Sequence, residues 1–286
     1  MSDSPKNHIL VTGASGNIGT PLVEQLRAAG ADFSVLRSQG PADAATRVAS
    51  YTDADALTRA FEGVDTLFLL LPLVENKLAL AANAALAAKR AGVRHIVRSS
   101  GAGADAASAF ALPRLQGKVD ELIAATGMAT TFIRPAAFMQ NFSTWMAGQV
   151  KAGTVYAAHG NAAQSLVDTR DIAAVAAQVL QNPALHAGKA YTLTGGQALT
   201  TQQFVSEIEQ VTGRTVNYQP VNFEQAMEAM TGMGMPGWMV ELLDSLNRIV
   251  AAGYAADISP DTANLLGRAP ITAQTFASDH VAAWKA

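Results

Sequence analysis

Cysteine is absent from the 286 residues, and this absence excludes whole classes of site. Without a thiol, the chain can form no disulfide, no thiolate nucleophile, no zinc-thiolate centre and no iron–sulfur cluster. Charged residues are also scarce, at 15%, against about 25% in an average soluble protein. Hydrophobic residues reach 49%, which excludes a disordered chain. Because every cysteine-based redox site is excluded, any redox chemistry has to come from a bound organic cofactor.

Long apolar runs are missing too. The alanine-rich stretch 80–88 is interrupted by polar residues before the roughly 20 apolar residues of a transmembrane helix accumulate. Twenty basic and 23 acidic residues give a net charge of −3 with no long block of like charges, so neither nucleic acid nor a membrane surface is an expected partner. The segment Met1–His8 is polar and lacks the apolar core of a secretory signal, so we expect a cytoplasmic protein.

Short apolar runs alternate with longer helix-period segments throughout the first half of the chain. This alternation is typical of parallel strands joined by crossover helices, so we expect an α/β fold with a doubly wound parallel sheet. Strands are predicted at His8–Thr12, Asp32–Leu36, Arg47–Ser50, Asp65–Leu71, His95–Ser99 and Thr130–Arg134, and helices at Ile18–Ala29, Ala54–Phe61, Glu75–Ala91 and Leu115–Thr126.

The rhythm changes after Pro135. The elements expected beyond this point are helices at Asn141–Val150, Asp171–Gln181 (with Asp171 as its cap) and Thr201–Thr212, a strand at Lys189–Leu193, and a methionine-rich, loop-rich segment after Arg214. We therefore expect residues 1–140 and 165–195 to form a dinucleotide-binding domain. Residues 141–164 and 196–286 are expected to form the substrate or lid domain.

A glycine-rich turn follows the first predicted strand. Gly13, Gly16 and Gly19 stand at three-residue spacing between that strand and a helix. Such glycines permit a tight turn, the approach of backbone to a pyrophosphate, and close helix packing, while the helix start supplies free N–H groups. An ordinary strand-to-helix turn is the alternative. The context favours dinucleotide binding by Gly13, Ala14, Ser15, Gly16, Asn17, Ile18 and Gly19.

The second strand indicates which dinucleotide binds. It ends in Arg37-Ser38, with no acidic residue placed to bond a ribose 2′-OH, whereas a guanidinium matches a 2′-phosphate. We therefore predict NADP(H), although an exposed strand-end arginine is the alternative. Further expected cofactor contacts are Leu70, Leu71, Pro72, Lys118 and Pro135.

Several motifs together resemble the NmrA-like branch of the atypical short-chain dehydrogenases/reductases. They are Gly13–Gly19, Arg37, Asp65–Leu71, His95–Ser100, Phe132–Pro135, Val167–Ala173 and Tyr191–Gly195. That branch includes triphenylmethane reductases, NADPH-dependent quinone reductases and NADP-sensing regulators. The resemblance spans essentially the whole chain and implies a doubly wound sheet that binds NADP(H), with a small lobe over a substrate cleft.

The chain also departs from that family and from ordinary short-chain reductases. Ser50 stands where an acidic residue is common, and Gln116 and Asp120 replace a histidine and glutamate. The tyrosine that donates a proton in ordinary members has a lysine four residues later, and none of the five tyrosines here does. This disfavours alcohol dehydrogenation, epimerisation and dehydration.

The lack of a tyrosine–lysine proton donor favours an acceptor whose reduction needs no strong acid. A hydroquinone anion or delocalised amine can take its proton from water, so we expect hydride transfer from NADPH to a planar conjugated carbonyl, quinone-like or dye-like substrate. Lys118, Ser99 and Ser100 are the candidate catalytic residues, and the alternatives are a solvated lysine and serines that cap local backbone. The expected apolar substrate wall, whose members can equally be core residues, comprises Phe138, Met139, Asn141, Phe142, Trp145, Met235 and Trp238.

Other functions remain open at this stage. A sensor that binds NADP(H) without turnover would also lack acid–base residues. The histidines show no metal-ligand spacing, so no metal site is expected. The pattern is compatible with a monomer or a homodimer.

Overall fold

The structure is a computed structural model that describes residues 7–285, so most of the polar segment Met1–His8 lies outside the described residues. The backbone divides into two compact units. Unit 1 contains Met1–Ser108, Pro113–Arg134 and Ile172–Tyr191, and unit 2 contains Ala109–Leu112, Pro135–Asp171 and Thr192–Ala286. The main junctions thus fall at 134/135, 171/172 and 191/192.

A seven-stranded sheet runs through unit 1, in the order β3-β2-β1-β4-β5-β6-β9. β1 pairs in parallel with β2 and β4, and the parallel ladder continues through β5 to β6. The predicted doubly wound α/β fold is therefore confirmed. The strands are β1 (Ile9–Thr12), β2 (Phe33–Arg37), β3 (Thr46–Val48), β4 (Thr66–Leu69), β5 (His95–Ser99), β6 (Ala129–Pro135) and β9 (Ala190–Leu193), whose last residues pass into unit 2.

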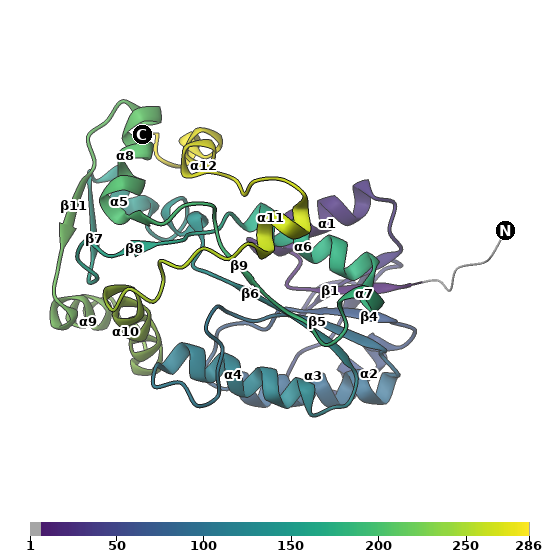
Figure 1. The fold of residues 1–286 in the computed structure, drawn as a ribbon. Helices are drawn as coiled ribbons and strands as arrows, with labels where there is room; N and C mark the ends of the chain where they lie inside the picture. Colours follow the sequence, from purple (N-terminus) through teal and green to yellow (C-terminus); the bar gives the residue numbers. More distant parts are fainter. Residues whose placement is uncertain (1–6, 286) are drawn as a thin grey trace. The chain divides into compact units, whose positions relative to one another are not determined.

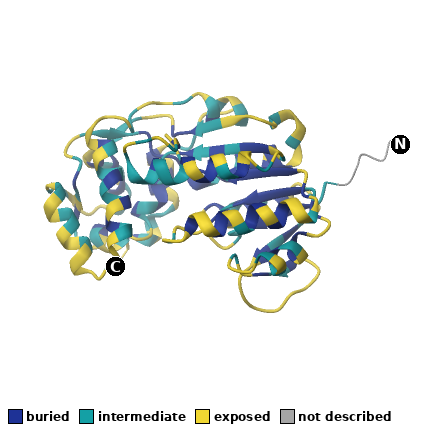
Figure 2. Cartoon of the chain, turned by 90° about the horizontal axis from the view of Figure 1, so that it is seen from below, coloured by how far each residue is buried: buried dark blue, intermediate teal, exposed yellow. Residues whose placement is uncertain are grey.

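Helices cover both faces of this sheet (Figure 1). α2, α3 and α4 lie on one face, where they share an apolar core with the strands, while α1 and α6 lie on the other. Figure 2 shows the buried strands between helices whose outer surfaces are exposed. The helices are α1 (Gly19–Ala28), α2 (Ala54–Phe61), α3 (Lys77–Ala91), α4 (Ala111–Ala124), α6 (Thr169–Gln181) and α7 (Pro183–His186).

Unit 2 has a separate core in which Phe204, Phe276 and Trp284 are almost fully buried. Its strands are β7 (Thr154–Ala157), β8 (Ala163–Gln164), β10 (Leu199–Thr200) and β11 (Asn217–Pro220). Its helices are η1 (Met139–Phe142), α5 (Ala147–Lys151), α8 (Thr201–Thr212), α9 (Phe223–Gly232), α10 (Gly237–Ala251), α11 (Asp261–Leu266), α12 (Ala273–Asp279) and η2 (Val281–Ala283).

Two predictions for this half of the chain are wrong. The segment after Arg214 is mainly helical, because Asn222 and Gln225 form a capping box that starts α9 and Pro236 precedes a second long helix. The single helix predicted at Asn141–Val150 is instead a short 3₁₀ turn followed by the brief helix α5.

The predicted cap of α6 is also wrong. Asp171 lies inside the helix, which begins at Thr169, and its carboxylate accepts hydrogen bonds from Arg268 and from the backbone N–H of Ile271. The residue that accepts an N–H of the first turn is Asp168, which bonds the amide of Arg170 at 2.8 Å. Asp171 thus ties its end of the helix to the 268–271 segment.

Among the helices of residues 7–285, none has the length and apolar character needed to span a membrane.

Candidate functional site

The glycine turn between β1 and α1 can be built only with glycine at two of its three positions. Gly13 has φ +67°, in the left-handed region that disfavours other residues. A Cβ on Gly19 would lie 2.0 Å from the carbonyl oxygen of Gly13 and 2.6 Å from Cα of Ala14, so no side chain fits there. A Cβ on Gly16 would meet only the Gly13 carbonyl, at 3.4 Å. The outer face of the turn is therefore open at Gly16.

The start of α1 has the features of an anion site. No side chain in the described part of the chain caps its first turn, and that turn has no acidic residue. Ser15, Gly16 and Asn17 are exposed beside these amide groups. Uncapped N–H groups and the positive end of the helix dipole suit a pyrophosphate, so the residues present fit the phosphates of a dinucleotide.

A hydrogen-bond network holds the neighbouring strand end against this turn. The hydroxyl of Thr12 accepts the backbone N–H of Leu70 at 2.8 Å, and the hydroxyl of Tyr51 donates to the Leu70 carbonyl at 3.3 Å. Leu70 in turn packs so closely on the turn that a Cβ on Gly13 would lie 2.9 Å from its Cδ2. Burial raises the pKa of Tyr51 to about 12, so this phenol stays protonated and serves as a donor.

Arg37 lies at the carboxyl end of β2 with an exposed side chain, and Ser38 follows it in an exposed bend. The pKa of the nearby Asp43 carboxyl is lowered, first because Ala45 donates a backbone hydrogen bond to it and, to a lesser extent, by the positive charge of Arg37. The predicted contacts Leu71 and Pro135 are buried, whereas Pro72 is exposed.

The three candidate catalytic residues differ in their surroundings. Lys118 is exposed on α4, and Ser99 is half-buried at the end of β5. Ser100 is 7% exposed and donates from its hydroxyl to Oδ2 of Asp120 at 3.0 Å. The structure thus links one of the two serines to a buried carboxylate and leaves Lys118 facing solvent.

Sequence reasoning missed a group of charged residues near these serines, which we call the buried charge cluster: the buried Lys77, Arg98 and Asp120, and the half-buried Arg134. Asp120 accepts hydrogen bonds from Nη1 of Arg98 and from Nη2 of Arg134, the latter at 3.0 Å. Arg98 also donates to Gln116 at 2.7 Å. An arginine directly after Ile96 and Val97, in a strand predicted to be buried, was the signal that could have revealed it.

The predicted substrate residues all lie in unit 2, in different settings. Phe142 is 4% exposed and stacks on Phe204 with 4.3 Å between ring centroids, so its position is explained by core packing without a ligand. Trp145 is 64% exposed. Met139 is buried, while the remaining four are half-buried, namely Phe138, Asn141, Met235 and Trp238.

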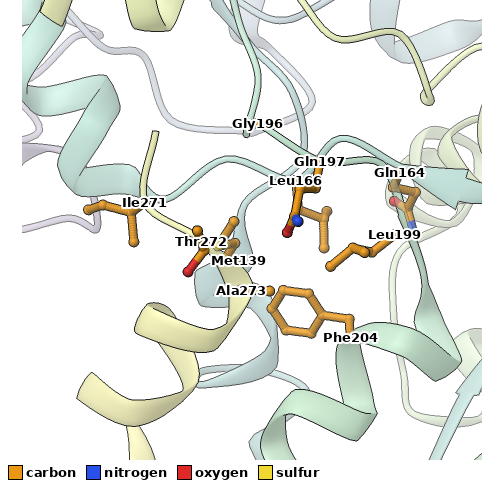
Figure 3. A pocket seen from close by; sticks show the side chains of 10 residues that line it. All are labelled: Met139, Gln164, Leu166, Gly196, Gln197, Leu199, Phe204, Ile271, Thr272 and Ala273. Carbon is orange, nitrogen blue, oxygen red and sulfur yellow. The ribbon is translucent and has the colours of Figure 1, made fainter. Parts of the chain in front are cut away.

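Met139 lines a small cavity within unit 2 (Figure 3). Figure 3 shows its walls formed by residues such as Leu166, Leu199 and Phe204, with the side chain of Gln164 at the edge. Its volume of about 20 Å³ holds little more than one water molecule. This cavity is therefore too small for an aromatic substrate.

Comparison with known proteins places the chain in a family. The sequence model of the NmrA-like family matches residues 5–266. The chain belongs to the NmrA-like family. The resemblance inferred from its motifs is thus confirmed, and the match extends from the first strand through α11.

Individual members of this family resemble the chain along its whole length. An NAD(P)H azoreductase from Xenophilus azovorans is 35% identical, covering 97% of this chain and 99% of the relative. The structure of NADPH-dependent quinone oxidoreductase 2 from Escherichia coli, in complex with NADPH, is 27% identical with a TM-score of 0.84, covering 95% and 99% of the two chains. Triphenylmethane reductase from Citrobacter sp., in complex with NADP(H), is 25% identical with a TM-score of 0.81, covering 96% and 99%.

Proposed function

We propose that the protein is an NADPH-dependent reductase that transfers hydride to a planar conjugated carbonyl, quinone-like or dye-like molecule. The observation that carries this proposal is the uncapped, acid-free start of α1 behind a turn that admits only glycine at Gly13 and Gly19. The proposal is supported by the similarity of the chain, over almost its full length, to an NAD(P)H azoreductase and to an NADPH-dependent quinone oxidoreductase.

The chain's own residues would bind and orient the cofactor. The amides of Gly13–Gly19 would hold the pyrophosphate, and Arg37 with Ser38 would hold the 2′-phosphate. Leu70, Leu71, Pro72, Lys118 and Pro135 would contact the rest of the dinucleotide. When bound, the dinucleotide supplies the hydride.

Among the steps of the proposed reaction, proton delivery is the one with the weakest candidate residues in this chain. Tyr51, near the glycine turn, has a pKa of about 12 and donates to the Leu70 carbonyl, so it is a poor acid at neutral pH. Burial also raises the pKa of Tyr218. We propose that Ser99 and Ser100 orient the acceptor and that its anion takes a proton from water. Of the predicted substrate residues, Met139 and Phe142 belong to the core of unit 2, and we propose that the acceptor contacts the other five, which are exposed or half-buried: Phe138, Asn141, Trp145, Met235 and Trp238.

A panel of acceptors tests the reaction. Purified protein, NADPH and a series of quinones, enones, azo dyes and triarylmethane dyes should show oxidation of the nicotinamide with at least one planar acceptor. Simple aldehydes and ketones, which form an alkoxide that needs an acid, should react much more slowly. Tight NADPH binding without oxidation by any acceptor would instead support a sensor that binds NADP(H) without turnover.

Cofactor choice is tested by Arg37→Ala. Loss of charge-assisted hydrogen bonds worth about 1.5–3 kcal/mol should weaken NADPH binding roughly 10- to 100-fold and leave NADH binding nearly unchanged. Arg27→Ala, at an exposed arginine in the last turn of α1, is the matched control and should alter neither affinity. Equal losses for NADPH and NADH in Arg37→Ala would exclude the 2′-phosphate contact.

A further inference from the structure

Two arginines of the buried charge cluster share one carboxylate, and only one of them reaches solvent. Arg98 and Arg134 both form ion pairs with Asp120, and among residues 7–285 no other carboxylate pairs with either arginine. Asp120 therefore balances only one of the two guanidinium charges. The side chain of Arg98 is 1% exposed, whereas that of Arg134 is 28% exposed. The excess positive charge is thus accessible at Arg134.

Arg134 uses only part of its guanidinium group for Asp120. Its Nε and Nη2 both donate to Oδ2 of Asp120, at 3.2 Å and 3.0 Å. These two bonds hold the planar group in one orientation and leave Nη1 available for another acceptor atom. The ring centroid of Phe132 lies 5.8 Å from the guanidinium carbon, an arrangement that favours a cation at this place.

The same carboxylate oxygen joins Arg134 to Ser100. The Ser100 hydroxyl donates to Oδ2 of Asp120 at 3.0 Å, so this hydroxyl and the guanidinium of Arg134 contact one atom. The backbone N–H of Ser100 also donates to the carbonyl of Ile133 at 2.7 Å, which fixes the serine against β6. Arg134 therefore has a fixed place beside a serine that is proposed to orient the acceptor.

Both residues lie at the edge of the sheet where ligands of this fold bind. β5 and β6 are parallel neighbours, and the parallel ladder connects them through β4 to β1, which leads into the glycine turn. Ser100 directly follows β5, and Arg134 is the last but one residue of β6. In a doubly wound sheet, ligands bind outside the carboxyl ends of the strands. The accessible cation is thus at the edge where the acceptor is proposed to bind.

The proposed reaction creates a negative charge that no acidic side chain neutralises. A neutral quinone takes up a hydride, which is one hydrogen with two electrons, from the bound dinucleotide, which is oxidised. The conjugated bonds of the quinone shift, so that an electron pair comes to rest on the oxygen at the other end of the system. Water supplies the proton afterwards. A fixed guanidinium near that oxygen stabilises the anion and the transition state that leads to it.

We propose that Arg134 is a catalytic residue that pairs with the anion formed when a neutral quinone-like acceptor is reduced. Asp120 is the positioning residue that holds its guanidinium in place. This inference rests on the proposed function and narrows its substrate class to neutral acceptors. A cationic triarylmethane dye becomes neutral when it takes up a hydride, so it gains no stabilisation from Arg134, and its own charge is repelled by the guanidinium.

The charge of the acceptor provides the test. In Arg134→Ala, kcat with NADPH and 1,4-naphthoquinone should fall roughly 100-fold, as when one donor to a developing oxyanion is removed. Reduction of the cationic dye malachite green should not fall. Arg94→Ala is the matched control, because Arg94 is an exposed arginine that pairs with Asp65 at 2.7 Å just before β5, and it should leave both rates unchanged. Equal losses for the quinone and the dye in Arg134→Ala would indicate a merely structural role and overturn the inference.

A binding measurement tests the same contact without turnover. 4-Nitrophenol, whose anion absorbs visible light, serves as a mimic of the reduced acceptor in the presence of saturating NADP⁺. Bound to the wild-type protein, it should titrate at least about one pH unit below the free phenol, because a nearby cation favours the anion. Arg134→Ala should abolish this difference, and Arg134→Lys, which keeps the charge, should retain part of it. A bound phenol that titrates like the free phenol in the wild-type protein would overturn the inference, whether or not Arg134→Ala folds.

Failure of this inference can be distinguished from failure of the proposed function. If the wild-type protein oxidises NADPH with no acceptor, the proposed function is wrong and the inference falls with it. If the wild-type protein and Arg134→Ala reduce 1,4-naphthoquinone equally fast, the inference alone is wrong and the reductase activity stands.

Discussion

Gly19→Ala should remove dinucleotide binding and destabilise the fold, whereas Gly16→Ala should affect binding alone. The alanine Cβ at position 19 would lie 2.0 Å from a backbone oxygen that cannot move without opening the turn. We expect a loss of about 3 kcal/mol in the free energy of unfolding, at the upper end of overpacking effects. No NADPH binding should be detectable by fluorescence titration.

The comparison with Gly16→Ala separates packing from recognition. A methyl group there is 3.4 Å from the nearest atom, the carbonyl oxygen of Gly13, so stability should change by less than about 1 kcal/mol. The same methyl would stand on the open face of the turn, where the pyrophosphate is proposed to approach. Loss of one or two charge-assisted hydrogen bonds would weaken NADPH binding roughly 10- to 100-fold. Wild-type affinity in Gly16→Ala would mean that the phosphates bind elsewhere.

Asp120→Asn should be the most destabilising change outside the glycine turn. It removes the only carboxylate that accepts from Arg98 and Arg134 within the cluster, and it leaves the guanidinium of Arg98, 1% exposed, without a counter-charge. Breaking a buried ion pair by removing one partner typically costs about 3–5 kcal/mol. Urea unfolding followed by circular dichroism would measure this loss.

The matched control is a carboxylate on the surface. Asp55 pairs with Arg90 at 3.1 Å, but both side chains are at least half exposed. Asp55→Asn should therefore cost no more than about 1 kcal/mol. Similar losses in the two variants would show that burial does not set the strength of the Asp120 contacts.

The sheet and the glycine turn could be predicted because their signals are local. The apolar run Thr66–Leu69 reads as a strand buried on both faces, and the three glycines follow β1 directly in sequence. Eight of the predicted elements, including the strand His95–Ser99 and the helix Thr201–Thr212, were placed within a residue of the observed bounds. The start of α4 was missed by four residues, since Pro113 was not recognised as part of a first helical turn.

The charge cluster and the burial of individual side chains depend on contacts between residues far apart in the sequence, which no local pattern predicts. Arg98 and Asp120 come from a strand and a helix and meet only because both face the same layer of unit 1. In unit 2, methionine, glycine and proline near residue 233 suggested loops, although a capping box at Asn222 had already fixed a helix start. Burial likewise could not be inferred for Phe142, which the apolar pattern makes equally suitable as core or as substrate wall.

Titration of the purified wild-type protein with NADPH and NADH, followed by nicotinamide fluorescence, tests the central claim most directly. The account predicts saturable binding of both dinucleotides, with NADPH the tighter, and loss of NADPH affinity in Gly16→Ala while the thermal midpoint stays within about 4 °C of the wild-type value. Failure of the folded wild-type protein to bind either dinucleotide would contradict it.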